Sequence, residues 1–319
     1  MLEKLKEIKK ALKDNDLPVY LAGHEYPDND SIGSCLAVAR LLEKMGKEAH
    51  VLLNDQDRDI LAVHDNQHLV TNTVSHDKYW FIALDLNETY RLINFEKYFK
   101  EAEFTINIDH HQGNYTNANI VLSNQSVSST CEIIYQLYTL FGREYLDLSI
   151  ASTLYTGIMT DTSVFARRLS TQTLAIAQKL LNFGINYEYL IANTYSKRTL
   201  YELKALALLV NEIQFDECLH YLIIDKSLPQ FSDLTHTQIT KTIAEELRKI
   251  DQIDVFLIFI LEKDSIVAKC MSNISKNANV IARLFGGGGH KGEAGFTIRN
   301  VSVEEILTKA KDFIKTLQK

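Results

Sequence analysis

The chain has 319 residues, 46% of them hydrophobic and 24% charged, a composition typical of folded globular proteins that excludes disordered and low-complexity classes. At roughly 150 residues per domain, this length predicts about two domains. The net charge of −7 excludes the broad basic surface that binds long nucleic acids through many phosphate contacts, whereas a small anionic substrate in a local pocket remains compatible with it.

Nothing in the sequence indicates export or a membrane. Residues 1–16 place leucine and isoleucine at helical spacing among lysine and glutamate, which predicts a surface helix and not a signal peptide. The longest apolar run, residues 255–261, is far too short to cross a bilayer. The four cysteines lie far apart without a Cys-x-x-Cys pair, which indicates reduced thiols. We therefore expect a cytoplasmic protein without membrane contacts.

The first part of the chain alternates apolar, β-rich runs with longer helical patterns, as βαβ units around a mostly parallel sheet do. The expected strands are residues 19–22, 49–53, 80–84 and 105–108. A helix is expected over residues 31–45, and residues 129–195 are nearly all helical, most clearly at 131–140, 148–159 and 171–183.

A helix over residues 200–211 leads into a second alternating region. Its expected strands are residues 221–224, 255–261, 266–271 and 295–298, and its expected helices are 235–250, 278–285 and 303–317. The predicted fold is α/β. It has a mostly parallel N-terminal domain with flanking helices (residues 1–190) and a linker helix with a smaller α/β C-terminal domain (residues 191–319).

Titratable residues cluster after the first, third and fourth expected strands. They are His24, Asp28, Asp30, Asp85, Asp109, His110 and His111. The ligand crevice of an open α/β sheet lies at the carboxyl ends of its strands, so we expect these side chains to converge. The first two clusters also have a structural explanation, because Asp residues are common in turns and helix caps. Asp161 ends an apolar helix, where the helix dipole disfavours a carboxylate, so a compensating cation is expected there.

Charge balance predicts a centre with two divalent cations. Its candidate ligands are four carboxylates and two imidazoles, namely His24, Asp28, Asp30, Asp85, His110 and Asp161. An oxygen-rich set of this kind favours Mn²⁺, with Mg²⁺ as the alternative, over a closed zinc site. Asp85 is the natural bridging ligand. Two such cations can clamp the attacking and leaving oxygens of a displacement at phosphorus.

The four clusters, in this order, resemble motifs I to IV of the DHH phosphoesterase superfamily, whose eponymous triplet matches Asp109-His110-His111. The resemblance implies one cation held by His24, Asp28 and Asp85, and a second held by Asp30, Asp85, His110 and Asp161. It also implies that His111 contacts the substrate phosphate and that Asp109 orients a neighbouring group. Asp109 and His111 are therefore the expected catalytic residues besides the metal ligands.

A run of four glycines, Gly286 to Gly289, is followed by His290. Glycines let backbone N–H groups approach a phosphate, and His290 can add a charge-assisted contact, although a flexible turn is the structural alternative. The segment resembles the glycine-rich loop of the DHH-associated domain, so the resemblance extends over essentially the whole chain. It implies an active site in the cleft between the domains and substrate contacts from Gly286, Gly287, Gly288, Gly289 and His290.

The chain departs from the related enzymes just before the loop helix. They often carry Ser-x-Arg-Ser there, whereas this chain has Lys269, Cys270, Met271 and Ser272. We therefore expect Met271 to occupy the place of a phosphate-binding arginine, and Met271→Arg to tighten binding of substrates with a terminal phosphate. Glu293 stands where the family usually has a small residue. The remaining histidines, His50 and His76 among them, belong to no motif and are expected in surface or core positions.

Within the superfamily, the glycine loop favours the nanoRNase and pAp-phosphatase type. The resemblance then implies a Mn²⁺-dependent hydrolase that converts short oligoribonucleotides and linear pApA to 5′-mononucleotides and 3′-phosphoadenosine 5′-phosphate (pAp) to AMP. The alternatives are an inorganic pyrophosphatase or short-chain exopolyphosphatase, a cyclic dinucleotide phosphodiesterase, and a nucleotide-binding regulator without catalysis. The expected partner is short RNA or a small nucleotide and not a long duplex. The oligomeric state stays open, with a homodimer among the options.

Overall fold

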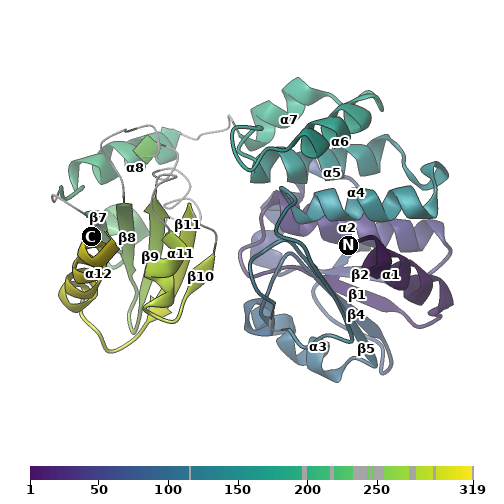
Figure 1. The fold of residues 1–319 in the computed structure, drawn as a ribbon, viewed down its shortest axis with the longest axis horizontal. Helices are drawn as coiled ribbons and strands as arrows, with labels where there is room; N and C mark the ends of the chain where they lie inside the picture. Colours follow the sequence, from purple (N-terminus) through teal and green to yellow (C-terminus); the bar gives the residue numbers. More distant parts are fainter. Residues whose placement is uncertain are drawn as a thin grey trace. The chain divides into compact units, whose positions relative to one another are not determined.

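The computed structural model describes residues 1–114, 116–195, 200–215, 219–232, 243, 246–247, 250, 255–272, 278–289 and 292–317 (Figure 1). The chain forms two compact units, Met1–Lys197 and Arg198–Lys319. Most of the helix expected over residues 235–250 lies outside the described residues, as do His290, Lys291 and Cys218. None of the described helices has the length and hydropathy that a bilayer-spanning helix requires.

The first unit contains a six-stranded sheet in which all neighbouring strands run parallel. Its order is β3 (Val70–Thr71), β2 (Ala49–Leu52), β1 (Val19–Ala22), β4 (Trp80–Leu84), β5 (Phe104–Asp109) and β6 (Ile120–Ser123). The prediction of a mostly parallel α/β domain is confirmed. The strand order reverses between β1 and β4, and a ligand crevice is expected outside the carboxyl ends of the strands at such a point.

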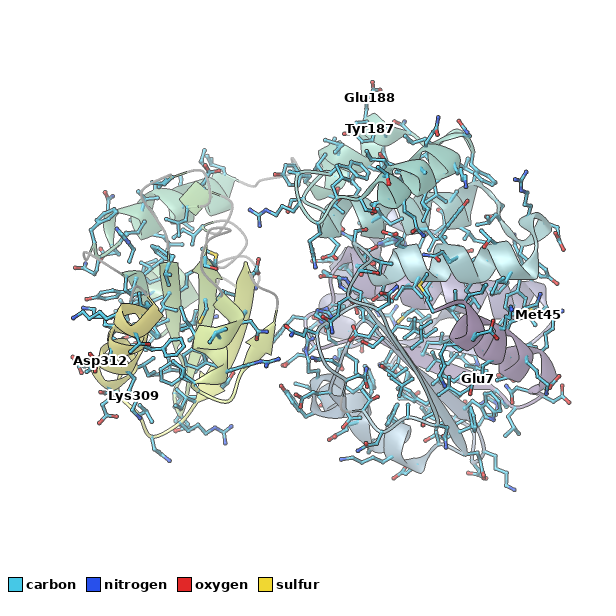
Figure 2. All side chains as sticks on the ribbon, viewed as in Figure 1. Glu7, Met45, Tyr187, Glu188, Lys309 and Asp312 are labelled. Atoms are coloured by element: carbon cyan, nitrogen blue, oxygen red, sulfur yellow. The ribbon has the colours of Figure 1, made fainter. Side chains whose placement is uncertain are left out.

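Alternating side chains give the sheet two apolar faces. In β1, Val19 and Leu21 join one core cluster, whereas Tyr20 and Ala22 join the other. One face is covered by α1 (Leu2–Asp14), α2 (Asn29–Lys44), α4 (Thr130–Phe141) and α5 (Leu148–Asp161), with α6 (Thr171–Leu181) and α7 (Tyr187–Thr194) beyond α5. The opposite face packs against the segment 89–95 and α3 (Glu96–Glu101) (Figure 1). Side chains fill the space between these layers (Figure 2).

Glycines allow α5 to lie close to α2 and α4. A Cβ at Gly157 of α5 would lie 2.4 Å from Sγ of Cys131 in α4 and 3.1 Å from the carbonyl oxygen of Asn29 in α2. A Cβ at Gly33 of α2 would lie 3.2 Å from the carbonyl oxygen of Thr153 in α5. This close approach matters for the site, because Asp161 is the last residue of α5.

The second unit contains a five-stranded mixed sheet. Its order is β10 (Gly288–Gly289), β11 (Glu293–Ile298), β9 (Ile266–Ser272), β8 (Val255–Leu261) and β7 (His220–Asp225). Only β7 and β8 are parallel; the other neighbours are antiparallel. Its described helices are α8 (Leu200–Asn211), α9 (Pro229–Ser232), α11 (Ala278–Arg283) and α12 (Val303–Leu317). The predicted smaller α/β domain is confirmed, with a sheet that is mixed and not parallel.

We predict that Gly157→Ala lowers the free energy of unfolding by about 1–3 kcal/mol, because the added methyl group overlaps Sγ of Cys131 and the backbone of α2. Chemical denaturation measures this loss. In a Cys131→Ala background the same substitution should cost less, since the atom at 2.4 Å is gone. An unchanged denaturation midpoint in the single variant would contradict the close packing of these helices.

Candidate metal centre

The candidate site lies at the carboxyl ends of three neighbouring parallel strands. His24 follows β1, Asp85 directly follows β4, and Asp109 is the last residue of β5, with His110 and His111 behind it. These strands are adjacent in the sheet in the order β1, β4, β5. The topology therefore gathers residues from widely separated parts of the sequence, as expected from the strand pattern.

The first cluster occupies the turn from β1 into α2. Asp28 is the N-cap of α2, and its Oδ1 accepts hydrogen bonds of 3.0 Å from the backbone N–H groups of Asp30 and Ser31. Its Oδ2 lies 3.9 Å from Nε2 of His24. A Cβ at Gly23 would lie 1.7 Å from Oγ and 3.1 Å from Cβ of Ser31, so any side chain there would force Ser31 to move. Asp28 thus combines a capping role with a place in the site.

The N-terminus of α4 holds two buried carboxylates. Oδ2 of Asp30 accepts a hydrogen bond of 2.7 Å from the N–H of Thr130, and its Oδ1 accepts one of 2.8 Å from the N–H of Cys131. The Thr130 hydroxyl donates to Oδ1 of Asp85 at 2.9 Å. Unpaired amides and the helix dipole favour negative charge at this end of a helix. This role of Thr130 could not be recognised from the sequence, because a hydroxyl-bearing residue at a helix start is also an ordinary capping residue.

Asp85 is held in an uncommon backbone conformation. Its φ is +60°, in the left-handed region, and its N–H donates to the carbonyl oxygen of Ile108 at 3.0 Å. The buried amide of Asn107 braces the turn by donating to the carbonyl oxygens of Ala83 and Leu86, at 3.2 and 2.9 Å. Strain of this kind persists where the surroundings fix the residue. Asn107 was also missed, since an Asn inside a strand carries no sequence signal for this contact.

His110 lies among three carboxylates. Its Nε2 is 3.4 Å from Oδ1 of Asp85, 3.5 Å from Oδ2 of Asp161 and 3.9 Å from Oδ2 of Asp30. On the other side of the cluster, Nε2 of His24 is 3.5 Å from Oδ2 of Asp85. Three overlapping sets therefore have their ligand atoms within 4.8 Å of one another: His24 with Asp28 and Asp85, Asp30 with His110 and Asp161, and Asp85 with His110 and His111. The first two sets match the ligands expected for the two cations. Asp85 belongs to the first set, and its Oδ1 lies 3.4 Å from Nε2 of His110 in the second.

Asp109 and His111 form a tight pair beside the cluster. Oδ1 of Asp109 and Nδ1 of His111 are 2.7 Å apart. Burial disfavours the charged imidazole, but the hydrogen bond and charge of Asp109 outweigh it and raise the pKa of His111. Nδ1 of His111 also lies 3.7 Å from Oδ1 of Asp85. Asp109 itself is fully buried, so its side chain can act on the site only through neighbours such as His111.

The cluster concentrates negative charge away from water. Burial, together with Asp85 and Asp161, raises the pKa of Asp30 well above its usual range. Burial also raises the pKa of Asp161. Burial disfavours the ionised form of Asp85 as well, yet His24, His111 and His110 hold its pKa well below the usual range. Carboxylates that raise one another's pKa in this way are stabilised by a bound cation.

Arg168 supplies positive charge at the end of α5. Its Nη2 donates to Oδ1 of Asp161 at 2.6 Å and to the carbonyl oxygen of the same residue at 2.7 Å. Oδ2 of Asp161 is buried and has no hydrogen-bond partner among the described residues. This oxygen faces His110. A buried carboxylate oxygen that no described residue donates to, next to imidazole and carboxylate groups, suits a divalent cation.

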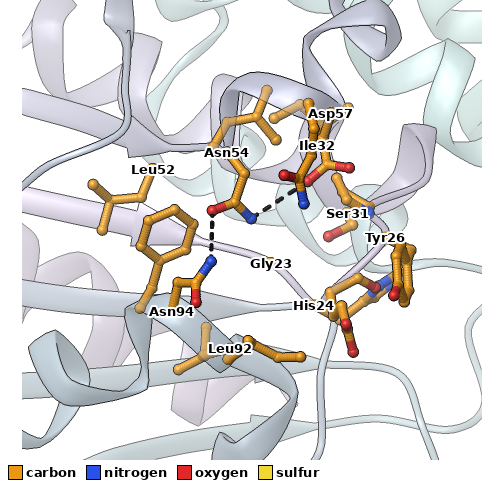
Figure 3. Close-up of a pocket in the computed structure, with 16 residues that line it drawn as sticks. Gly23, His24, Tyr26, Ser31, Ile32, Leu52, Asn54, Asp57, Leu92 and Asn94 are labelled. Atoms are coloured by element: carbon orange, nitrogen blue, oxygen red, sulfur yellow. Dashed lines mark hydrogen bonds between the residues drawn. The ribbon is translucent and has the colours of Figure 1, made fainter. Parts of the chain in front are cut away.

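A small pocket lies beside His24, at the ends of β1 and β2 (Figure 3). Its wall contains a chain of polar groups in which Asn94 donates to Oδ1 of Asn54 at 3.1 Å and Asn54 donates to Oδ2 of Asp57 at 3.4 Å. Leu52 and Leu92 form the apolar part of the lining. The pocket therefore offers polar and apolar contacts next to the candidate metal ligand His24.

In the second unit, the glycine run connects α11 to β11. Gly286 and Gly289 have φ values of +78° and +142°, and a Cβ at Gly287 would lie 2.1 Å from the carbonyl oxygen of Gly295. Gly288 and Gly289 form the short strand β10, paired with β11. The run thus forms a turn followed by a short edge strand. Its positive φ values and close backbone contacts require glycine. Its phosphate-binding role stays a prediction, as does the role of His290, which lies outside the described residues.

The expectation for Met271 is wrong. Met271 lies in β9, is 2% exposed and packs in the core with Phe256 and Leu209, so an arginine at this position would be buried among apolar side chains. A sequence alignment gives no information on which face of the strand a residue occupies. The second departure, Glu293, is paired with Nζ of Lys269 at 2.6 Å.

Comparisons with known proteins agree with this arrangement. Residues 18–158 match the DHH family, N-terminal domain, and residues 219–316 match the DHHA1 domain. The bifunctional oligoribonuclease and PAP phosphatase NrnA of Thermus thermophilus is 24% identical over 316 residues, which cover 98% of this chain and 94% of the relative.

Solved structures show the same fold. An exopolyphosphatase-related protein from Bacteroides fragilis superposes with a TM-score of 0.84 at 19% identity, covering 100% of this chain and 98% of that one. RecJ from Thermus thermophilus, crystallised with Mn²⁺, gives a TM-score of 0.55 at 14% identity, covering 98% of this chain and 54% of that one. At these identities the likeness concerns the fold.

We predict that Mn²⁺ stabilises the folded chain and that Asp85→Asn abolishes most of this effect, because a neutral amide cannot serve both ligand sets. A single site at about 100 times its Kd contributes roughly 2.7 kcal/mol, which thermal unfolding with and without Mn²⁺ detects. The matched control is Asp59→Asn, an exposed carboxylate outside the cluster, which should keep the full response. An equal response of both variants would exclude Asp85 as a ligand.

Proposed function

The chain belongs to the DHH phosphoesterase superfamily, with a DHHA1 domain after the DHH domain, and on this premise we propose that it is a Mn²⁺-dependent hydrolase of short oligoribonucleotides. Its substrates would be nanoRNA and linear pApA, cleaved to 5′-mononucleotides, and pAp, cleaved to AMP. The observation that carries the proposal is the pair of ligand sets around Asp85 at the carboxyl ends of β1, β4 and β5.

In the proposed mechanism, two divalent cations would activate a water molecule and neutralise the charge that develops on the phosphoryl group. His24, Asp28 and Asp85 would hold one cation. Asp30, Asp85, His110 and Asp161 would hold the other, so that Asp85 would serve both cations. The amides of α4 keep the carboxylate of Asp30 in place.

Asp109 and His111 would act on the substrate itself. Asp109 fixes the imidazole through Nδ1 and raises the pKa of His111, which favours the protonated ring; in that form Nε2 can donate to a phosphate oxygen. Arg168 donates to Oδ1 of Asp161, so Oδ2 would be the oxygen that holds the cation. Each of these residues therefore has a distinct role in binding, orientation or charge balance.

The choice of substrate rests on three features. The net charge of −7 argues against long nucleic acids and leaves short anionic chains. The glycine turn in the second unit has the backbone freedom to bind a terminal phosphate through Gly286, Gly287, Gly288, Gly289 and His290. The Thermus thermophilus relative bears the name of an oligoribonuclease and PAP phosphatase.

The same proposal assigns the metal centre to residues 1–190 and substrate binding to residues 191–319. We also propose a cytoplasmic location. The described cysteines, Cys35, Cys131 and Cys270, are buried free thiols, as is usual in a reducing compartment.

A substrate panel tests the proposed function. With Mn²⁺, the purified chain should hydrolyse pApA and a labelled RNA pentamer faster than pyrophosphate or cyclic di-AMP, because the proposed site combines a two-cation centre with a loop for a terminal phosphate. Product analysis should find 5′-mononucleotides, and Asp85→Asn should be inactive on every substrate. Preferred hydrolysis of pyrophosphate or of cyclic di-AMP would replace the proposal by one of these alternatives, and binding without hydrolysis would indicate a regulator.

We predict that His290→Ala raises KM for pApA by about tenfold or more, the loss expected for one charge-assisted contact. Hydrolysis of bis-p-nitrophenyl phosphate, which has no terminal phosphate, should change little. Steady-state kinetics on both substrates makes the comparison. An equal loss on both would place the loop at the reacting phosphate and overturn the division of roles between the two units.

A further inference from the structure

A second group of potential metal ligands lies outside the site described above. Glu48, His50 and His76 each offer one ligand atom, and these atoms lie within 4.8 Å of one another. We propose that these three side chains form a zinc site at the amino ends of the strands. The inference is independent of the proposed function, because it uses none of the residues around Asp85.

The three ligands come from two neighbouring segments of the first unit. Glu48 precedes β2, His50 is the second residue of β2, and His76 belongs to the segment that leads into β4. In the sheet register His50 lies opposite Tyr20 of β1. All of them are close to the amino ends of their strands, whereas His24, Asp85 and Asp109 are at the carboxyl ends. The two sites therefore lie at opposite ends of the strands of one sheet.

The distances between the ligand atoms suit a tetrahedrally coordinated ion. Nε2 of His50 lies 2.8 Å and Nε2 of His76 lies 3.5 Å from the same oxygen, Oε1 of Glu48. Ligands bound to zinc at about 2.0–2.1 Å in tetrahedral geometry are roughly 3.3 Å apart, so small side-chain rotations suffice to place an ion among these atoms. The exposed fractions of the Glu48, His50 and His76 side chains are 50%, 31% and 34%, which leaves a path for the ion and a position for water.

Tyr20 orients both imidazoles from the buried side. Its ring stacks on His50 with centroids 5.1 Å apart, and its hydroxyl oxygen lies 2.8 Å from Nδ1 of His76. The same oxygen accepts a hydrogen bond from the N–H of Ser75 at 3.1 Å, and the hydroxyl can donate to Oγ of Ser75, also at 3.1 Å. Tyr20 can then accept the Nδ1–H proton of His76, which leaves a lone pair on Nε2 for a metal. Metal-bound histidines usually have such a partner on the other ring nitrogen.

The ligand atoms of this site predict a different metal preference from that of the carboxylate-rich site around Asp85. Two imidazoles and one carboxylate favour Zn²⁺ over Mn²⁺, since affinity at nitrogen-rich sites rises along the first-row series toward copper and zinc. A single contact between a histidine and a carboxylate would not suffice to form a zinc site. His68 lies 2.9 Å from Oε1 of Glu43, a similar distance, but this pair has one imidazole and belongs to none of the ligand groups found among the described residues. His68 therefore provides a matched control.

The test is calorimetric titration of the full chain with Zn²⁺, performed in an Asp85→Asn background that weakens the first site. One Zn²⁺ should bind per chain at the proposed site. His50→Gln and His76→Gln should each weaken this binding by at least about 100-fold, and Tyr20→Phe, which keeps the ring but removes the hydroxyl, by about 10–100-fold. His68→Gln should change nothing. Thermal unfolding without zinc checks that each variant is folded, and Glu48→Gln provides a third ligand variant.

Unchanged Zn²⁺ affinity in folded His50→Gln and His76→Gln would overturn the proposal, and so would an equal loss in His68→Gln. In the otherwise unaltered chain, His76→Gln should keep the full Mn²⁺-supported hydrolysis of pApA. Absence of hydrolysis in the unaltered chain would refute the proposed function and leave the zinc result standing, because the titration measures binding in a chain that already lacks Asp85.

Discussion

The first unit depends on placing three carboxylates, the buried Asp30 and Asp85 and the largely buried Asp161, within 4 Å of one imidazole nitrogen of His110, with the more exposed Asp28 beside them. Like charges at such distances raise the pKa of a neighbouring acid and oppose folding unless donors or cations offset them. The backbone supplies the donors. Two N–H groups at the start of α4 bind Asp30, two at the start of α2 bind Asp28, and Arg168 binds Asp161. Helix N-termini thus make the site possible before any ion binds.

The need for hydrogen-bond donors next to these carboxylates also constrains how α2, α4 and α5 pack. The start of α4 can reach Asp30 only if α2, α4 and α5 pack closely, and the small residues at Gly33 and Gly157 permit that approach. Asp85 comes from the sheet, where it follows β4 in a left-handed backbone conformation. Hydrogen bonds from the side chain of Asn107 to the flanking carbonyl oxygens hold this turn. The parallel sheet provides the common edge, and the reversal of strand order between β1 and β4 opens it.

Much of this arrangement could be predicted from the sequence, because parallel strands and their terminal polar clusters have a local signature. The sequence pattern predicts on that basis that His24, Asp85 and His110 converge, and the structure places Nε2 of His24 and Nε2 of His110 3.5 and 3.4 Å from the carboxylate of Asp85. The bond from Thr130 to Asp85 and the support from Asn107 could not be predicted, since they arise only when distant segments meet. The edge strand β3 has only two residues, too few for a periodic pattern. The other edge strand, β6, was missed although its four residues equal β1 and β2 in length.

Predictions for the second unit were less complete for a physical reason. Strand locations follow from apolar runs, but the direction of pairing depends on connections, and the short turn between β8 and β9 forces an antiparallel pair. Met271 shows the same limit at the level of one residue. Its position in the sequence suggested a phosphate contact, whereas the pleat of β9 turns it into the core.

Hydrogen bonding at two carboxylates has a consequence for ion selectivity. Oδ1 of Asp28 is engaged by the α2 amides and Oδ1 of Asp161 by Arg168, so each residue has one oxygen left for a cation. Both would therefore be monodentate ligands. Calcium relies on bidentate carboxylates and a loose shell of six to eight oxygens, whereas Mg²⁺ needs compact octahedral geometry. Helix capping, a contribution to folding, would in this way also restrict the coordination number and discriminate against calcium in the cell.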